Sequence, residues 1–239
     1  MPVRADCPSV QHIPLFKLRG EVSARGFVRL VYHHRQHTPA VTGKHLMTAT
    51  SAEKRKWTRS EYLAFEREAS DKHELWNGEL FAMAGATREH NRIVSNLNAV
   101  LWNATRNGPC EPYPSDMKVR IPGTDNFCYP DALVVCGPQE FDIDGKDVLL
   151  NPSVICEVLS PNTESYDRGE KFFQYRTIQT VSDYVLLSQE RVRIEHFVRK
   201  PDGSWLMRDL GAGGYLRLSI GCEVIVDEIY LKVFSQSQA

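Results

Sequence analysis

Long apolar runs are missing from this sequence. No stretch approaches the roughly 20 apolar residues that a membrane-spanning helix needs. The start of the chain also lacks the apolar core of a secretory signal, so we expect no membrane partner and a cytoplasmic location. The composition does not exclude a transit peptide, because residues 1–46 are basic and poor in acidic residues.

Closely spaced cysteine pairs are also missing. None of the six cysteines forms a C-x-x-C motif, which argues against a zinc site. Cys136 and Cys156 fall in apolar segments, where a cysteine usually acts as a small core residue. Reduced thiols of this kind fit the cytoplasm.

Net charge is nearly absent, but it is unevenly distributed. The whole chain has a formal charge of −1, whereas residues 1–46 hold seven basic and two acidic residues, so residues 47–239 carry about −6. An acidic body argues against tight non-specific binding to duplex nucleic acid, because such binding depends on neutralising phosphates. Two alternatives remain, scattered surface charges or a local basic groove built from Lys118, Arg120, Lys171 and Arg176.

The same difference in charge suggests the domain organisation. Residues 1–46 show no helical or strand period, and Met47 opens a stretch that reads like a natural protein start. We interpret residues 1–46 as a disordered arm or as an upstream extension from a misplaced start codon. The functional alternative is a basic arm that binds nucleic acid. Residues 47–239 are predicted to form a single domain, which is long enough for a sizeable core.

Two short apolar runs dominate the rest of the chain, and each carries one carboxylate. Asp131 opens the first run, and Glu157 lies in the middle of the second. Alternation along a strand puts Glu157 on a face with Ile155 and Leu159, and both faces are apolar, as in an interior strand. An ionised carboxylate there is costly unless a metal, a cation or several hydrogen-bond donors compensate it.

A cation follows shortly afterwards. We expect a helix to begin near Asp167, because Asp167 and Glu170 have the spacing of a capping box. Lys171 then lies in its first turns, and Tyr175 lies four residues later on the same side. Carboxylates can hold a hard divalent cation, while the lysine can orient or deprotonate a water or stabilise a phosphate. Two simpler roles remain open: Asp167 as a helix cap or partner of Lys171, and Tyr175 as a packing residue.

Cap and turn signals predict the other elements. Thr58 with Glu61 has capping-box spacing, Asn77–Gly78 favours a tight hairpin, and Thr87 can cap a helix. The order of elements predicts an α/β (α+β) sandwich with a mixed central sheet. The expected elements are a helix to about residue 68, strands at 73–76 and 79–83, a helix at 88–106, a strand at 113–121, a loop at 137–151, and antiparallel strands at 182–188, 192–199, 205–209 and 215–218.

The residues of this region resemble a known family. Pro130–Asp131, the run Glu157–Pro161, Asp167, Lys171 and Tyr175 together are similar to the Uma-two family, also called domain of unknown function 820. Its members are assigned to the PD-(D/E)XK superfamily of nucleases, and the likeness extends from about residue 58 to residue 233. The resemblance implies a restriction-endonuclease-like core, with a mixed central β-sheet flanked by helices, extra antiparallel strands at the C-terminal side, and the site at one edge of the sheet.

The resemblance also implies an activity. It points to an endonuclease that uses Mg²⁺ or Mn²⁺ to hydrolyse phosphodiester bonds of DNA. Asp131 and Glu157 would be the metal ligands, and Lys171 would position water or stabilise the phosphate. The superfamily lysine is expected two residues after the acidic residue, where this chain has Leu159, so Lys171 would replace it from the helix. Since restriction nucleases usually act as dimers, a homodimer is left open.

Two further residues join the candidate site through the resemblance. Glu79 lies on the Glu-Leu strand that approaches the site in the family, and His90 follows that hairpin. A solvent-facing hairpin residue is the equal alternative for Glu79, and a structural histidine is the alternative for His90.

Two other functions are compatible with the sequence. One is a non-catalytic module of the same fold that binds nucleic acid or a protein partner, which Leu159 and the acidic body favour. The other is a structural protein in which a buried Glu157–Lys171 pair only holds the fold. The substitution Glu157→Ala separates them, because it would unfold the structural protein and leave the nuclease folded.

Overall fold

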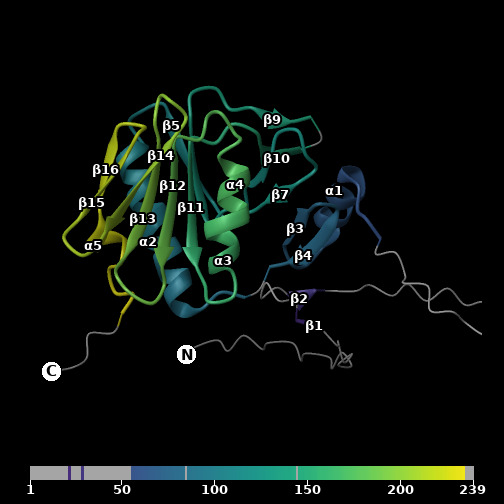
Figure 1. Ribbon diagram of the computed structural model, residues 1–239, viewed down its shortest axis with the longest axis horizontal. Coiled ribbons are helices and arrows are strands. Elements are labelled where there is room, and N and C mark those ends of the chain that lie inside the picture. Colours follow the sequence, from purple (N-terminus) through teal and green to yellow (C-terminus); the bar gives the residue numbers. More distant parts are fainter. Residues whose placement is uncertain (1–20, 23–27, 30–54, 84, 144, 235–239) are drawn as a thin grey trace, which may run out of the picture.

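The computed structural model describes residues 21–22, 28–29, 55–83, 85–143 and 145–234. In this part of the chain, two six-stranded sheets form the body of the molecule (Figure 1). The central sheet has the strand order β14–β13–β12–β11–β8–β5, and the lateral sheet has the order β4–β3–β7–β6–β10–β9. Two strands of the predicted extension, β1 (Glu21–Val22) and β2 (Val28–Arg29), pair antiparallel, and the rest of residues 1–46 lies outside the described residues.

The central sheet is mixed, as the sequence predicts. β11 and β12 run parallel, and every other neighbouring pair in this sheet is antiparallel. The strands after the lysine-bearing helix lie close to the predicted ranges. The six strands are β5 (Cys110–Pro114), β8 (Ala132–Cys136), β11 (Val154–Leu159), β12 (Asp183–Ser188), β13 (Ile194–Arg199) and β14 (Trp205–Leu210).

Two predictions for segments of the lateral sheet are wrong. The strand predicted over 113–121 is divided between the two sheets, because a turn at Ser115–Asp116 separates β5 from β6. The segment 137–151, predicted to be a loop, contains β9 and β10, and the buried Val148 and Leu149 pair with β6. The strands of this sheet are β3 (His73–Trp76), β4 (Glu79–Ala82), β6 (Lys118–Arg120), β7 (Phe127–Cys128), β9 (Phe141–Asp142) and β10 (Gly145–Leu149).

The helix caps and the hairpin turn are confirmed. α1 (Arg59–Glu68) begins with a complete capping box between Thr58 and Glu61. The turn between β3 and β4 needs positive φ at both central positions, and Asn77 and Gly78 supply 49° and 74°. α2 (Arg88–Thr105) begins after Thr87, whose hydroxyl accepts from the backbone N–H of His90 at 3.1 Å.

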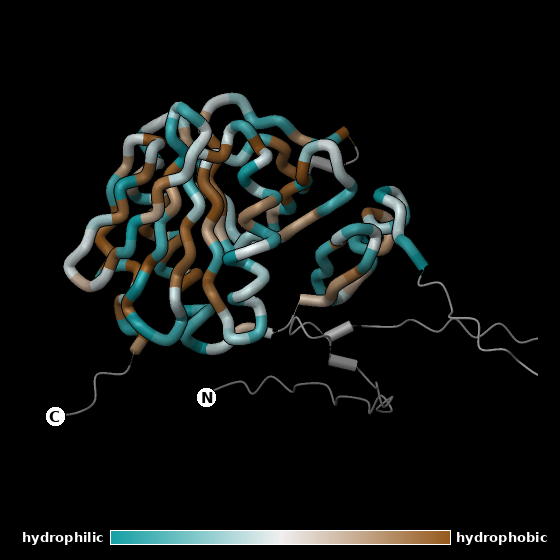
Figure 2. Tube along the Cα trace, viewed as in Figure 1, coloured by the Kyte–Doolittle hydropathy of each residue, from teal (hydrophilic) through white to brown (hydrophobic). Residues whose placement is uncertain are grey.

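Both faces of the central sheet are covered. α2, α5 (Val226–Ile229) and the hairpin of β15 (Tyr215–Leu218) and β16 (Cys222–Ile225) pack on one face. The other face meets the lateral sheet and the segment of α3 (Glu164–Tyr166), the π-helical turn η1 (Asp167–Lys171) and α4 (Phe172–Tyr175) (Figure 1). All six residues of β11 are therefore buried, and its trace is mainly hydrophobic in Figure 2.

Two cysteines differ from the expectation of reduced core thiols. Cys110 on β5 and Cys136 on β8 are directly opposite in the antiparallel ladder and form a disulfide. Cys156 is a buried free thiol, as predicted for a core cysteine. The sequence spacing of 26 residues hides the pair, because only the strand register brings the two side chains together.

Replacing Cys136 with serine should lower the unfolding free energy by about 3 kcal/mol, because the bond closes a medium-sized loop in the unfolded chain. Urea unfolding without reductant measures this, and Cys222→Ser is the matched control because Cys222 is a free, partly exposed cysteine. With dithiothreitol the parent should become as unstable as the variant. If reductant leaves the parent unchanged, the bond does not stabilise the protein.

None of the described helices is both long enough and apolar enough to cross a membrane.

Candidate active site

Glu157 and Lys171 meet in the interior, between β11 and the π-turn. The alternation of β11 points Glu157 toward the α3–α4 side of the sheet, with Ile155 and Leu159. The Lys171 Nζ atom lies 3.1 Å from the Glu157 Oε1 atom, and both residues are buried, with 6% and 3% exposure. The predicted compensation of a strand carboxylate by this lysine is present in the structure.

Two further carboxylates surround the same ammonium. Glu74 of β3 places its Oε1 atom 3.0 Å from Lys171 Nζ, and Asp167 places its Oδ1 atom 3.6 Å away. The Tyr175 hydroxyl donates to Glu157 Oε1 over 3.3 Å. We call these five residues the lysine cluster; three buried carboxylates face one buried lysine within it.

The excess of carboxylates shifts the proton equilibria of the cluster. Burial raises the pKa of Glu157, which the Lys171 ammonium opposes and the neighbouring carboxylates reinforce. Burial lowers the pKa of Lys171, but Glu157, Glu74 and Asp167 outweigh it and hold the pKa well above its usual value. Burial also raises the pKa of Asp167 to about 6. Lys171 therefore stays protonated, while the raised pKa values of Glu157 and Asp167 favour binding of protons by these two carboxyls.

The raised pKa of Asp167 predicts a pH-dependent stability. The carboxyl normally titrates at 3.8, so between that pH and about 6 the folded chain keeps a proton that the unfolded chain has released. This contribution stabilises the fold at low pH and is lost as the pH rises to about 6. From pH 4 to 7, the stability of Asp167→Asn relative to the parent should rise by roughly 2–3 kcal/mol in urea unfolding. A constant difference would contradict the raised pKa.

Asp131 and His90 form a more accessible pair beside the cluster. The Asp131 Oδ2 atom accepts from the backbone N–H of Val158 at 2.7 Å and lies 3.3 Å from His90 Nε2. Their side chains keep 14% and 15% exposure. Burial lowers the pKa of His90, but the hydrogen bond and the charge of Asp131, together with the charge of Asp167, outweigh this and raise it. Because Val158 adjoins Glu157 in β11, the two predicted metal ligands are brought to neighbouring positions.

The helix prediction needs one correction. The helical segment begins at Glu164, three residues before the predicted start, after a turn in which Ser160 bonds Thr163 and Glu164. Asp167 is therefore inside the helical segment and buried, so it pairs with Lys171 and does not cap the helix. Asp167 therefore does not mark the start of the helix, because Ser160 and Thr163 provide the local hydrogen bonds of the preceding turn.

The hairpin contributes Glu74 to the cluster, while Glu79 lies elsewhere. Glu79 is partly exposed next to the turn, and its carboxylate lies 3.7 Å from Lys56. Glu74 is buried, and its Oε1 atom also accepts from the backbone N–H of Tyr129 at 3.0 Å. The sequence signal for Glu74 is a carboxylate inside the predicted strand at 73–76, and the structure buries all four residues of this strand.

The basic groove considered from the sequence does not assemble from the four residues named. Lys118 is buried beside Asp147 and Tyr129, and Arg120 pairs with Asp142. Lys171 belongs to the lysine cluster, and Arg176 lies over the ring of Phe173 at 4.4 Å. Three of the four charges are thus engaged with carboxylates.

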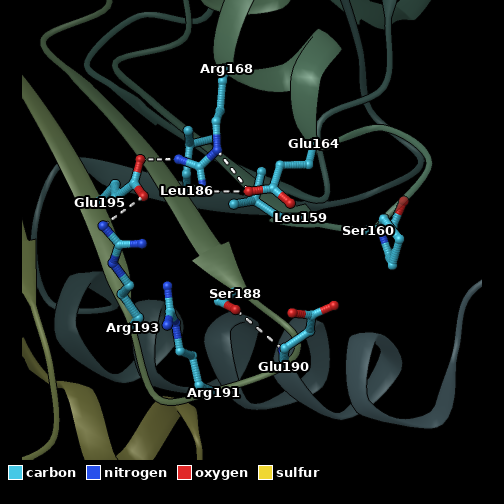
Figure 3. A pocket seen from close by; sticks show the side chains of 11 residues that line it. Leu159, Ser160, Glu164, Arg168, Leu186, Ser188, Glu190, Arg191, Arg193 and Glu195 are labelled. Carbon is cyan, nitrogen blue, oxygen red and sulfur yellow. Dashed lines mark hydrogen bonds and ion pairs between the residues drawn. The ribbon is translucent and has the colours of Figure 1, made fainter. Parts of the chain in front are cut away.

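A pocket lies beside the cluster at the ends of β11 and β12 (Figure 3). Leu186, which pairs with Glu157 in the sheet, and Leu159 form part of its wall. Arg168 of the π-turn projects into it and is held by Glu164 and Glu195. The lining combines arginine and glutamate side chains, so the pocket carries both positive and negative charges and is not a basic pocket.

The carboxylates of the lysine cluster and of Asp131 match a hard divalent cation in donor type. Asp131, Glu157 and Glu74 offer carboxylate oxygens, the ligands that Mg²⁺ and Mn²⁺ prefer. In the described ranges, no group of three or more His, Cys, Asp or Glu side chains is arranged to hold a metal ion. The Lys171 ammonium instead lies between the carboxylates of Glu74 and Glu157.

Comparisons with known proteins bear on this site. A family model named Uma2, described as "putative restriction endonuclease", matches residues 59–221. Two Synechocystis proteins, named uncharacterized proteins slr1290 and sll1609, are 38% and 35% identical, over 73% and 64% of this chain and 92% and 86% of their own length. The crystal structure of "a putative nuclease belonging to DUF820" from Anabaena variabilis matches with a TM-score of 0.62 and 12% identity, covering 74% of this chain and 99% of that chain. This structural likeness confirms the predicted fold class.

Proposed function

This chain belongs to the Uma-two family, and from its lysine cluster we propose that it is a metal-dependent endonuclease that hydrolyses phosphodiester bonds of DNA. The observation that carries the proposal is the excess of buried carboxylates around one lysine, next to the more exposed Asp131. A fold does not retain such an excess for stability, because each unpaired buried charge is costly. Clusters of this kind are typical of catalytic sites.

Asp131 and Glu157 would hold a Mg²⁺ or Mn²⁺ ion. When bound, the ion would activate a water and neutralise charge on the phosphate. The Oδ2 atom of Asp131 is oriented by the backbone N–H of Val158 and by His90. His90 thereby positions Asp131, and its raised pKa lets it carry a positive charge near the anionic substrate at mildly acidic pH.

Lys171 would act as a fixed positive charge. Because the surrounding carboxylates hold its pKa well above the usual value, it donates hydrogen bonds and does not serve as a base. Such a preorganised donor stabilises the negative charge that develops on the phosphate during hydrolysis. Glu74 and Asp167 hold its ammonium, and Tyr175 orients Glu157.

The test is cleavage of supercoiled plasmid and of a labelled single-stranded oligonucleotide by the full chain. Reactions contain Mg²⁺, Mn²⁺ or EDTA, and Asp131→Asn is compared with Asp202→Asn, which changes an exposed turn residue. We expect cleavage only with metal, and only by the parent and the Asp202→Asn protein. Equal cleavage by Asp131→Asn would identify a contaminant and overturn the proposal.

A second candidate is a non-catalytic module that binds nucleic acid. The burial of Glu157 and Lys171 favours it, because a phosphate must reach them for hydrolysis. In the same reactions this candidate predicts a gel shift of the oligonucleotide with EDTA and no cleavage with either metal.

A further inference from the structure

The helical segment that contains Lys171 includes a π-turn. η1 (Asp167–Lys171) separates α3 from α4. Residues five apart face the same side in a π-turn, whereas in an α-helix they diverge by about 140°. Accordingly, the Lys171 Nζ atom lies 5.8 Å from the ring centroid of Tyr166, five residues earlier. The π-turn therefore sets which side chains of this segment face Glu157.

Tyr184 of β12 contacts this turn at both ends. Its hydroxyl donates to the backbone carbonyl of Asp167, the first residue of the turn, over 2.8 Å. Its ring stacks on Phe172, the first residue after the turn, with centroids 5.0 Å apart and an interplanar angle of 17°. Tyr184 is fully buried, so no water competes for these contacts.

A π-turn needs support of this kind. It interrupts the regular i→i+4 bonding, and a side-chain donor on a helix carbonyl competes with the α-helical bond to the same oxygen. The sheet fixes the position of Tyr184, because it pairs with Ile155 of β11. Tyr184 and Glu157 thus project from the same face of two neighbouring strands.

We propose that Tyr184 is a positioning residue that fixes the π-turn and thereby holds Lys171 against Glu157 and Glu74. Without the hydroxyl, the segment relaxes toward a regular α-helix, which rotates Lys171 relative to Tyr166. The catalytic consequence rests on the proposed nuclease function, but the placement of Lys171 can be measured without it.

The test is competitive acetylation of the full chain with acetic anhydride, without metal or nucleic acid, followed by peptide mass spectrometry. In Tyr184→Phe, the labelling rate of Lys171 should rise between about twofold and tenfold, the range of one buried hydrogen bond. Tyr230→Phe is the matched control: Tyr230 is also buried and donates to a backbone carbonyl, that of Arg193, at 2.7 Å. Lys118, also buried, is the internal standard in each sample.

A rise confined to Lys171 and to Tyr184→Phe supports the proposal. Unchanged labelling of Lys171, or an equal rise at Lys118, overturns it. Where the parent cleaves DNA, kcat of Tyr184→Phe should fall by a similar factor with KM nearly unchanged, whereas Tyr230→Phe keeps the kcat of the parent. Selective labelling together with an inactive parent would refute the nuclease function and leave the positioning role standing.

Discussion

Replacing Lys171 with methionine should destabilise the protein by about 3–5 kcal/mol at pH 7, because it removes one partner of a buried ion cluster. Three carboxylates, those of Glu74, Glu157 and Asp167, would then remain buried without a compensating cation. The deficit should shrink at pH 5, because burial raises the pKa values of Glu157 and Asp167 and these two carboxyls then bind protons more readily. Urea unfolding followed by tryptophan fluorescence at both pH values measures the effect.

Lys56→Met is the matched control. Lys56 also lies near a glutamate, Glu79 at 3.7 Å, but its side chain is 62% exposed. Its replacement should change the unfolding free energy by no more than about 0.5 kcal/mol. Equal stability of Lys171→Met and Lys56→Met at pH 7 would contradict the stabilisation of the buried carboxylates by Lys171.

Replacing Glu157 with glutamine should abolish cleavage and leave the fold intact. Lys171 keeps Glu74 at 3.0 Å and Asp167 at 3.6 Å, so no unpaired charge is created. The raised pKa of Glu157 also means that a neutral side chain is well tolerated at this position. The variant should match the stability of the parent within about 1 kcal/mol, while the cleavage rate falls at least about a thousandfold.

Glu195→Gln is the control for Glu157→Gln, because it should lose stability and keep the cleavage activity. Glu195 is buried on the same face of the sheet, and its carboxylate pairs with Arg168 and Arg193. Removing its charge should cost about 1–3 kcal/mol and leave the cleavage rate within a few-fold of the parent. If Glu157→Gln unfolds, the cluster holds the fold together, as the structural alternative predicts. A folded Glu157→Gln protein with full activity would exclude Glu157 from catalysis.

Local signals predicted most of the elements and four of the five residues of the lysine cluster. The cap at Thr58, the turn at Asn77–Gly78 and the alternation around Glu157 depend on neighbouring residues, and all three predictions match the structure. Lys171 could also be predicted, because the helical segment that follows β11 packs against this strand and brings the lysine to Glu157. The family resemblance added the expectation that Asp131 and Glu157 are metal ligands.

The fifth residue of the lysine cluster depends on long-range pairing. Glu74 reaches Lys171 only because the lateral sheet packs against the α3–α4 side of the central sheet. The turn signal at Asn77–Gly78 predicted its strand but gave no partner for Glu74. The π-turn around Lys171 and the pairing of Cys110 with Cys136 likewise have no local signature, since one depends on Tyr184 and the other on strand register.

The most direct measurement is the thermal unfolding of the full chain with and without a divalent cation. If the excess carboxylates form a cation site, saturating Mn²⁺ or Mg²⁺ should raise the Tm of the parent by several degrees, because a ligand that binds only the folded state stabilises it. Asp131→Asn should lose most of this rise, and Asp202→Asn should keep it. No rise in the parent, or an equal rise in Asp131→Asn, would contradict a metal site at Asp131 and Glu157.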